Sequence, residues 1–278
     1  MLLLGQYNYL TILRKTSVGF YLGDDEGNDV LLPNKYILPE YEIGSKIRVF
    51  VYKDYEQRWI ATNLTPFAEA GQFAFLEVRS VSEHGAFLIW GLEKDLFVPF
   101  REQKQKMESG RSYVVYVTID EETQRMMATT KIHRHLKNSD LKFEPGDAVN
   151  LLIFETTPLG YNAIINQKHK GLIYHNEIFR PIHIGDKFRG YIKQIRENDQ
   201  IDLSLQPIGM QRLEDGAEQI VQALEKQKGF IPLTDNSSPE DIQQQLKMSK
   251  KNFKKSVGIL FKQKRILLEN NGIRLVKS

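Results

Sequence analysis

Three stretches of the chain carry glycines at the same offsets, and this repeat constrains the fold more than any other feature. The glycines are Gly5, Gly19 and Gly44, then Gly71, Gly85 and Gly110, then Gly146, Gly160 and Gly185. Within each stretch the second glycine lies 14 residues after the first and the third lies 39 residues after it, although the stretches begin 66 and 75 residues apart. A glycine at a fixed place in a strand-rich pattern marks a bulge, a tight corner or a close backbone approach. The shared spacing therefore predicts one backbone path repeated three times.

Each repeat has the pattern of short β-strands. Polar and apolar residues alternate around Lys46, Arg48 and Val51, and strand-like residues recur over 113–119. An aromatic or aliphatic run follows each inner glycine, and a polar turn follows that run. About five strands in roughly 65 residues are typical of a small Greek-key barrel. We predict a multidomain, mainly β chain, with three tandem barrels over residues 1–66, 67–138 and 139–208 and a different domain over residues 209–278.

Composition narrows the class of protein further. Of the 278 residues 41% are hydrophobic and 26% charged, as expected for globular domains. The start of the chain lacks the basic flank and the apolar run of a signal peptide, and no segment suits a membrane span, so we expect a cytoplasmic protein. The absence of cysteine excludes disulfides and thiol chemistry, the six histidines are scattered, and no glycine-rich phosphate loop is present. We therefore expect no enzyme, no cofactor and no metal site.

The net charge of +3 is distributed unevenly. Residues 1–66 carry 7 basic and 8 acidic side chains, residues 67–138 carry 10 and 10, and residues 139–208 carry 8 and 9. Residues 239–278 carry 10 basic and 3 acidic side chains, which gives this segment a charge of +7. Such a block can be a solvated surface, but its concentration favours a polyanionic partner, with nucleic acid ahead of a membrane surface.

Helical spacing replaces the strand pattern after residue 208. A linker over 206–216 is followed by a predicted helix over 217–228, which ends at Gly229. A second helix begins after Ser238, where a capping serine precedes proline and two acids. A third is predicted from Ser249 to about Lys262. Its inward face is expected to hold Phe253, Val257, Leu260 and Phe261.

The last residues complete the outline of a winged helix-turn-helix domain. Residues 265–268 and 273–276 predict a β-hairpin around a turn that contains Gly272. The start of the third helix has a positive dipole end and basic side chains, which suits contact with phosphates. The candidate nucleic-acid-binding residues here are Lys250, Lys251, Asn252, Lys254, Lys255, Lys262, Lys264 and Arg265. The alternative is a structural cap or protein-docking domain whose lysines only aid solubility.

The repeats resemble the S1-type RNA-binding OB-fold. The third copy resembles it best, because Gly171-Leu172-Ile173-Tyr174 and the strand at 201–205 stand where the family has its central and final segments. The family usually has aromatic residues one before and two after the inner glycine, and a histidine fourteen after it. Here the first position holds Val18, His84 and Leu159, the second holds Tyr21, Phe87 and Asn162, and the third holds Pro33, Pro99 and Tyr174.

Exposed rings on such a surface stack on bases, and neighbouring cations follow the phosphates. The candidate rings are Tyr21, Phe87 and Tyr174, with Phe20, His84 and Tyr161 as neighbours that can replace them through a shifted bulge. The candidate cations are Arg58, Arg125, Lys193 and Arg196. Each ring has the alternative of filling a barrel interior, and the sequence does not separate the two faces. Since the repeats are almost neutral, we expect weak binding by each barrel and a gain in affinity through linkage.

Three S1-type barrels followed by a winged helix resemble the bacterial conserved virulence factor B family, the YitL-like proteins, over the whole chain. The resemblance implies a cytoplasmic RNA-binding protein that affects gene expression, including virulence genes, without known catalytic chemistry. We expect single-stranded RNA as the partner, mainly at the third barrel and the winged helix, and no membrane. The alternative is a transcription factor whose winged helix binds duplex DNA while the barrels bind proteins. Base preference, target transcripts and oligomeric state stay open.

Overall fold

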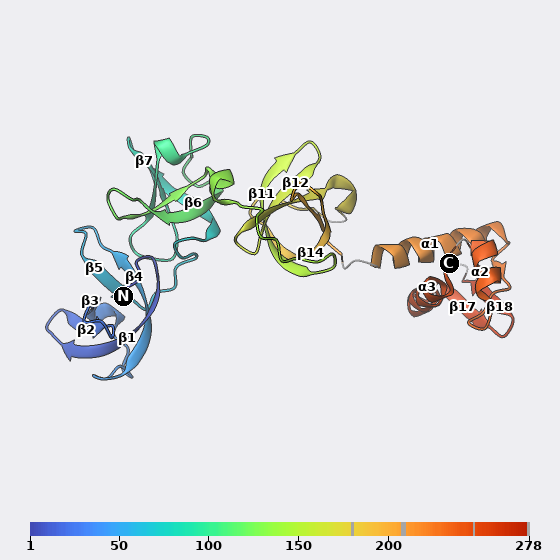
Figure 1. Ribbon diagram of the computed structural model, residues 1–278, viewed down its shortest axis with the longest axis horizontal. Coiled ribbons are helices and arrows are strands. Elements are labelled where there is room, and N and C mark those ends of the chain that lie inside the picture. Colours follow the sequence, from blue (N-terminus) through green and yellow to red (C-terminus); the bar gives the residue numbers. More distant parts are fainter. Residues whose placement is uncertain (179–180, 207–209, 247, 277–278) are drawn as a thin grey trace. The chain divides into compact units, whose positions relative to one another are not determined.

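The computed structural model describes residues 1–178, 181–206, 210–246 and 248–276, with the side chains of 210–215 and 251 outside that description. Within the described residues, three closed five-stranded barrels precede a small α+β region with three helices (Figure 1). This confirms the fold class predicted from the glycine pattern. The chain divides into two compact units, residues 1–141 with 150–188 and residues 142–149 with 189–278. The domain boundaries at residues 66, 138 and 208 stay predictions.

All three barrels have the same strand order. The first consists of β1 (Gln6–Lys15), β2 (Gly19–Gly23), β3 (Asp29–Pro33), β4 (Lys46–Lys53) and β5 (Trp59–Thr62), with the 3-10 helix η1 (Asn34–Tyr36). The second consists of β6 (Phe73–Val81), β7 (Gly85–Leu88), β8 (Leu96–Pro99), β9 (Ser112–Ile119) and β10 (Met126–Thr129), with η2 (Phe100–Glu102). The third consists of β11 (Ala148–Thr157), β12 (Gly160–Ile165), β13 (His169–Tyr174), β14 (Lys187–Ile195) and β15 (Ile201–Ser204), with η4 (His175–Glu177); η3 (Ile132–His135) precedes it. Each barrel closes by pairing its third and fifth strands.

The inner glycine of each repeat permits a close approach between two strands. Gly19, Gly85 and Gly160 have φ of +155°, +158° and +153°, a backbone conformation that favours glycine. A Cβ at these positions would lie 2.1, 2.3 and 1.9 Å from the carbonyl oxygens of Leu32, Val98 and Ile173. The first and third glycines also keep equivalent roles. The N–H groups of the first glycines, Gly5, Gly71 and Gly146, donate at 2.8 Å to the carbonyls of Val51, Val117 and Ile192. Those of the third glycines, Gly44, Gly110 and Gly185, donate at 2.8 Å to the carbonyls of Ile12, Val78 and Ile153. The three repeats therefore share one backbone path, as predicted.

Strand β4 is buried on both faces, unlike an alternating surface strand. Val49 and Val51 belong to the core of the first barrel. Phe50 and Tyr52 point the other way, into a core that continues into the second barrel. There the Phe50 ring meets Trp90 edge to face, with centroids 5.9 Å apart. This covering of both faces explains why four consecutive apolar residues of β4 are buried.

The C-terminal region confirms the three predicted helices but moves the first boundary. Helix α1 (Met210–Lys226) begins seven residues before the predicted start at residue 217, so Gly216 lies inside the helix and not in a linker. A Cβ at Gly216 would lie 2.5 Å from the Ser256 Oγ atom of α3 (Lys250–Lys262). The glycine therefore allows α1 and α3 to pack closely. Among the described residues, no helix is long and apolar enough to cross a membrane.

Helix α2 (Pro239–Leu246) starts as predicted, with the Ser238 hydroxyl accepting the N–H of Asp241 at 3.0 Å. The hairpin consists of β17 (Ile266–Glu269) and β18 (Gly272–Leu275), and β16 (Phe230–Ile231), which the sequence did not predict, adds a third strand. Gly272 begins β18 and is not in the turn. A Cβ there would lie 2.3 Å from the Ile231 carbonyl oxygen, so this glycine admits β16.

One residue of α3 was assigned to the wrong face. Phe253, Val257 and Leu260 are buried in the core of the winged helix as predicted. Phe261 is 51% exposed, because it follows Leu260 by one position and a helix turns by about 100° per residue.

The close approach at the inner glycine leads to a stability prediction. Gly19→Ala is expected to lower the free energy of unfolding by about 2 to 4 kcal/mol, from backbone strain and a steric clash. Gly27 is a matched control in the same hairpin, since its φ is +83° but nothing lies within 4 Å of an added Cβ. Gly27→Ala is expected to cost about 1 kcal/mol. Urea unfolding of the full chain, followed by tryptophan fluorescence, measures both, and equal losses would contradict the assignment.

Candidate nucleic-acid interface

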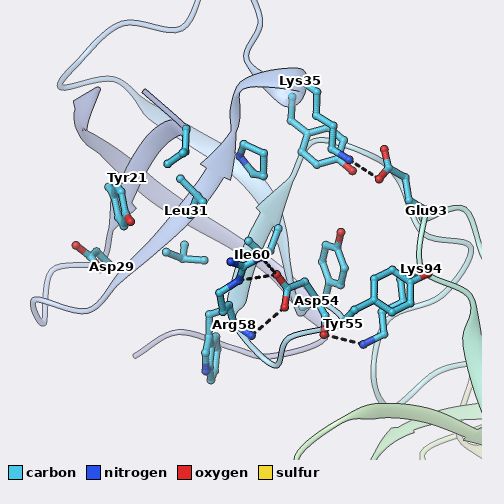
Figure 2. A pocket seen from close by; sticks show the side chains of 16 residues that line it. Tyr21, Asp29, Leu31, Lys35, Asp54, Tyr55, Arg58, Ile60, Glu93 and Lys94 are labelled. Carbon is cyan, nitrogen blue, oxygen red and sulfur yellow. Dashed lines mark hydrogen bonds and ion pairs between the residues drawn. The ribbon is translucent and has the colours of Figure 1, made fainter. Parts of the chain in front are cut away.

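A groove of about 670 Å³ runs across the first barrel (Figure 2). Its walls come from β2, β3, η1 and the turn between β4 and β5, and one end is closed by Glu93 and Lys94 from the loop between β7 and β8. The rings in its lining are those of Tyr21, Tyr36, Tyr52, Tyr55 and Trp59. The groove thus combines a concave surface with several flat side chains.

The rings of the groove differ in exposure. Tyr36 and Tyr52 are buried and form its floor, and burial raises the pKa of the Tyr52 hydroxyl. Tyr55, in the turn after β4, is 74% exposed, and Trp59, at the start of β5, is 37% exposed. Tyr21 on β2 is half-buried, in agreement with a ring at the surface. Tyr55 and Trp59 were not among the predicted rings, although their position on both sides of a polar hairpin tip was a usable signal.

A cation lies close to each of the three accessible rings. The Arg14 guanidinium lies 4.1 Å from the centroid of Tyr21, the Lys53 ammonium 5.9 Å from that of Trp59, and the Lys94 ammonium 5.2 Å from that of Tyr55. These distances suit cation–π attraction. They also place a positive charge over one face of each ring.

Acidic residues offset several of these cations. Asp29 pairs with Arg14 at 2.8 Å, and Arg58, a predicted phosphate ligand, pairs with both Asp54 and Glu56 at 2.8 Å. Asp54 also organises the β4–β5 turn by accepting backbone N–H bonds from Glu56 at 2.8 Å and Arg58 at 3.0 Å. Partial burial acts to raise the pKa of Asp54, but the hydrogen bonds from Arg58 outweigh it, and the pKa lies below its ordinary value. The paired Arg58 therefore positions the turn that carries Tyr55.

The second barrel presents fewer rings. Phe87 is half-buried and packs against Phe97 with centroids 5.1 Å apart, while His84 and Arg125 are exposed. Phe20, named as a neighbour in the first barrel, is a wrong prediction. It is 5% exposed and lies in the barrel core, because β2 directs Phe20 inward and Tyr21 outward.

In the third barrel a polar network replaces the ring two residues after the inner glycine. Asn162 is buried and its amide donates at 2.8 Å to Glu155, which also meets Lys104 at 2.8 Å and His133 at 3.3 Å. Burial acts to raise the pKa of Glu155, but the bonds from Lys104 and Asn162 outweigh it and hold the pKa at about 2. Asn162 at this position therefore binds a carboxylate that is ionised at neutral pH.

The other predicted residues of the third barrel lie at the surface. Tyr161 and Tyr174 are half-buried, and Tyr161 meets His175 edge to face at 6.0 Å. Lys193 is exposed at a bulge of β14. Arg196 donates to Asp202 from Nε at 3.0 Å and from Nη2 at 2.9 Å. The groove of the first barrel brings more rings and cations together than this region does.

The winged helix places its predicted residues along and after α3. Ser249 caps the helix by accepting the Asn252 N–H at 3.3 Å, and Lys250 and Asn252 are half-buried. Lys254, Lys255, Lys262, Lys264 and Arg265 are exposed, and Lys254 lies 3.9 Å from Asp235. The side chain of Lys251 lies outside the described part of the chain. In that part, no group of three or more His, Asp or Glu side chains has the arrangement of a metal site.

Two family models match parts of the chain. The S1 domain matches residues 4–64, and the CvfB-like winged helix domain matches residues 218–275. The S1 match thus includes the first repeat, the one that carries the groove, whereas the third repeat was predicted to resemble the family best.

Relatives cover almost the whole chain. The uncharacterized protein YitL of Bacillus subtilis is 26% identical over 96% of this chain and 91% of its own length. Conserved virulence factor B of Staphylococcus aureus is 26% identical over 99% of this chain and 95% of its own length. The crystal structure of a multidomain protein with nucleic acid binding domains from Streptococcus pneumoniae covers 98% of both chains at 23% identity, with a TM-score of 0.41.

The Asp54 network predicts a pH-dependent loss of stability. Because the folded-state pKa is lowered, the carboxylate stabilises the fold above its unfolded pKa of about 3.9, and this contribution is lost as the pH falls through the folded value. Asp54→Asn is expected to cost about 1 kcal/mol at pH 7, and less below about pH 4. Urea unfolding at pH 7 and pH 3 measures the difference. Glu56→Gln, at a 69% exposed side chain, is the control, and a pH-independent loss for Asp54→Asn would contradict the role of the charge.

Proposed function

Since the chain belongs to the conserved virulence factor B family, we propose that it is a multidomain nucleic-acid-binding protein whose target is single-stranded RNA. Its role in this proposal is regulation of gene expression without catalysis, in agreement with the virulence factor name of the S. aureus relative. The proposal places the main barrel contact in the groove of the first barrel and adds a second contact at the winged helix.

The observation that carries the proposal is the pairing of rings with cations in the groove. Tyr21, Tyr55 and Trp59 each have a cation within 6 Å of the ring centroid. Every base has a π-face, so rings of this kind bind single strands with little sequence preference, and the neighbouring cations attract phosphates. Base pairs in a duplex are already stacked, which disfavours duplex in this groove.

Charge explains why the two surfaces act together. The first 66 residues have one more acid than base, so the groove alone has no long-range attraction for a polyanion. The +7 segment at residues 239–278 supplies that attraction, and its α3 directs the positive end of a helix dipole toward Lys250 and its neighbours. Linking a weak stacking site to a cationic domain raises the affinity above that of either part.

A competition titration separates this proposal from a duplex DNA-binding transcription factor. The full chain is titrated with a labelled homopolymeric RNA, and unlabelled RNA or duplex DNA of equal length competes. Release by single-stranded RNA at lower concentration than by duplex DNA supports the proposal. Preferential release by duplex DNA, or no binding of RNA at low salt, would contradict it.

Removal of the groove rings tests stacking directly. Trp59→Ala and Tyr55→Ala are each expected to raise the Kd for single-stranded RNA about fivefold to a hundredfold, the loss of one stacked base. Fluorescence anisotropy of labelled RNA measures the Kd. Tyr9→Ala removes a 65% exposed ring that does not line the groove and is expected to leave it unchanged. Equal effects of all three variants would contradict the assignment of Tyr55 and Trp59 to the RNA contact.

Charge reversal at the start of α3 tests the winged helix. Changing Lys250, Lys251, Lys254 and Lys255 to Glu is expected to abolish detectable binding, and milder Ala variants are expected to flatten the slope of log K against log salt by up to about 3. A control with the same charge change alters four lysines exposed elsewhere, Lys142, Lys168, Lys187 and Lys226. If the variant with the four α3 lysines changed to Glu still binds RNA, recognition belongs to the barrels alone.

A further inference from the structure

The loop between β7 and β8 of the second barrel is held firmly against the groove of the first. Trp90 in this loop is 2% exposed, and its Nε1 donates to the Lys94 carbonyl at 2.6 Å. The Lys94 ammonium in turn donates to the carbonyls of Lys53 at 3.1 Å and Asp54 at 2.8 Å. Gly91, with φ of +94°, is required because a Cβ there would lie 2.5 Å from the Thr65 carbonyl oxygen. The position of Glu93, between these anchors, is therefore determined by the fold.

Glu93 uses that position to pair with Lys35 of η1 across the end of the groove (Figure 2). Lys35 also lies 4.9 Å from the ring centroid of Tyr36 on the groove floor. The shared hydrogen bond raises the pKa of Lys35 and lowers the pKa of Glu93, so both side chains are charged at neutral pH. Their side chains are 54% and 53% exposed. An ion pair this exposed contributes little to stability and opens easily.

The second barrel has the equivalent cation in a different arrangement. Arg101 stands two residues after Pro99, as Lys35 stands two residues after Pro33, and it pairs with Asp120 of its own barrel at 2.8 Å. Asp120 in turn corresponds in the repeat to Asp54, which binds Arg58 in the first barrel. In the first barrel Asp54 pairs with Arg58, and Lys35 pairs instead with Glu93 of the second barrel.

We propose that Glu93 stands in for an RNA phosphate beside Lys35 and so weakens binding of single-stranded RNA to the first barrel. This inference rests on the proposed function of the groove. A phosphate, like a carboxylate, offers anionic oxygens to the ammonium group, so an incoming strand competes with Glu93 for Lys35. When the strand enters, the displaced carboxylate remains nearby and repels it. The pair therefore lowers the affinity of the first barrel for any strand whose phosphate contacts Lys35.

The test is Glu93→Gln in the full chain, with labelled single-stranded RNA at low salt. The Kd is expected to fall about twofold to fivefold, the effect of one exposed charge pair. The slope of log K against log salt is expected to steepen by about 0.7, for one further phosphate contact. Glu77→Gln, with the same charge change at an exposed side chain of the second barrel that does not line the groove, is expected to change neither.

Lys35→Gln completes a double-mutant cycle with Glu93→Gln. It is expected to have little effect alone and to remove the gain when combined with Glu93→Gln. Weaker or unchanged binding by Glu93→Gln, with thermal stability retained, would overturn the inference. A pair that only stabilises the fold gives no tighter binding when it is broken, so a lower Kd distinguishes the two roles. If Trp59→Ala reduces binding and Glu93→Gln does nothing, only the inference fails; if Trp59→Ala binds like the unaltered chain, the proposed function of the groove fails first.

Discussion

The barrels depend on a contact between backbones that only glycine permits. At Gly19, Gly85 and Gly160 the second strand of each barrel lies so close to the third that a methyl group has no room. The residue opposite is Pro33, Pro99 or Tyr174, which precedes the short 3-10 helix of each barrel. This contact determines the register of two strands and the direction in which the chain leaves them. In the first barrel the ring two residues after the inner glycine, that of Tyr21, points outward for the same reason, because side chains alternate along a strand of known register.

The fold was predictable because this backbone constraint requires one residue type, glycine, at a regular spacing. Which face of a strand or helix a side chain occupies was harder to predict. Phe20 and Tyr21 are both aromatic and adjacent, and only the strand register determines that Phe20 enters the core. Gly216 shows the same difficulty in a helix, since the sequence does not distinguish a glycine that lets a neighbouring helix pack closely from a glycine in a linker. Phe261 was assigned to the core by spacing, but a helix has room for only some of its apolar residues inside.

The candidate groove was predictable in part. Tyr21 and Arg58 followed from the resemblance to S1-type domains, while Tyr55, Trp59 and the loop at Glu93 and Lys94 did not. Tyr55 and Trp59 belong to a hairpin tip whose shape depends on the Asp54 network, and Glu93 and Lys94 are contributed by another repeat. Contacts of this second kind leave no periodic trace in one sequence. The Asn162–Glu155 network likewise appears only when Lys104 and His133 are seen beside it.

The shared core at β4 makes the first two repeats dependent on each other. Phe50 and Trp90 bury their rings mutually, and Phe50 also meets Tyr7 edge to face at 5.6 Å. A chain cut between these copies would leave an aromatic stripe open to water on one piece and an indole on the other, both prone to aggregation. Although the glycine pattern is threefold, the smallest N-terminal piece that keeps these rings out of water contains two copies, so the first two repeats are not interchangeable independent domains.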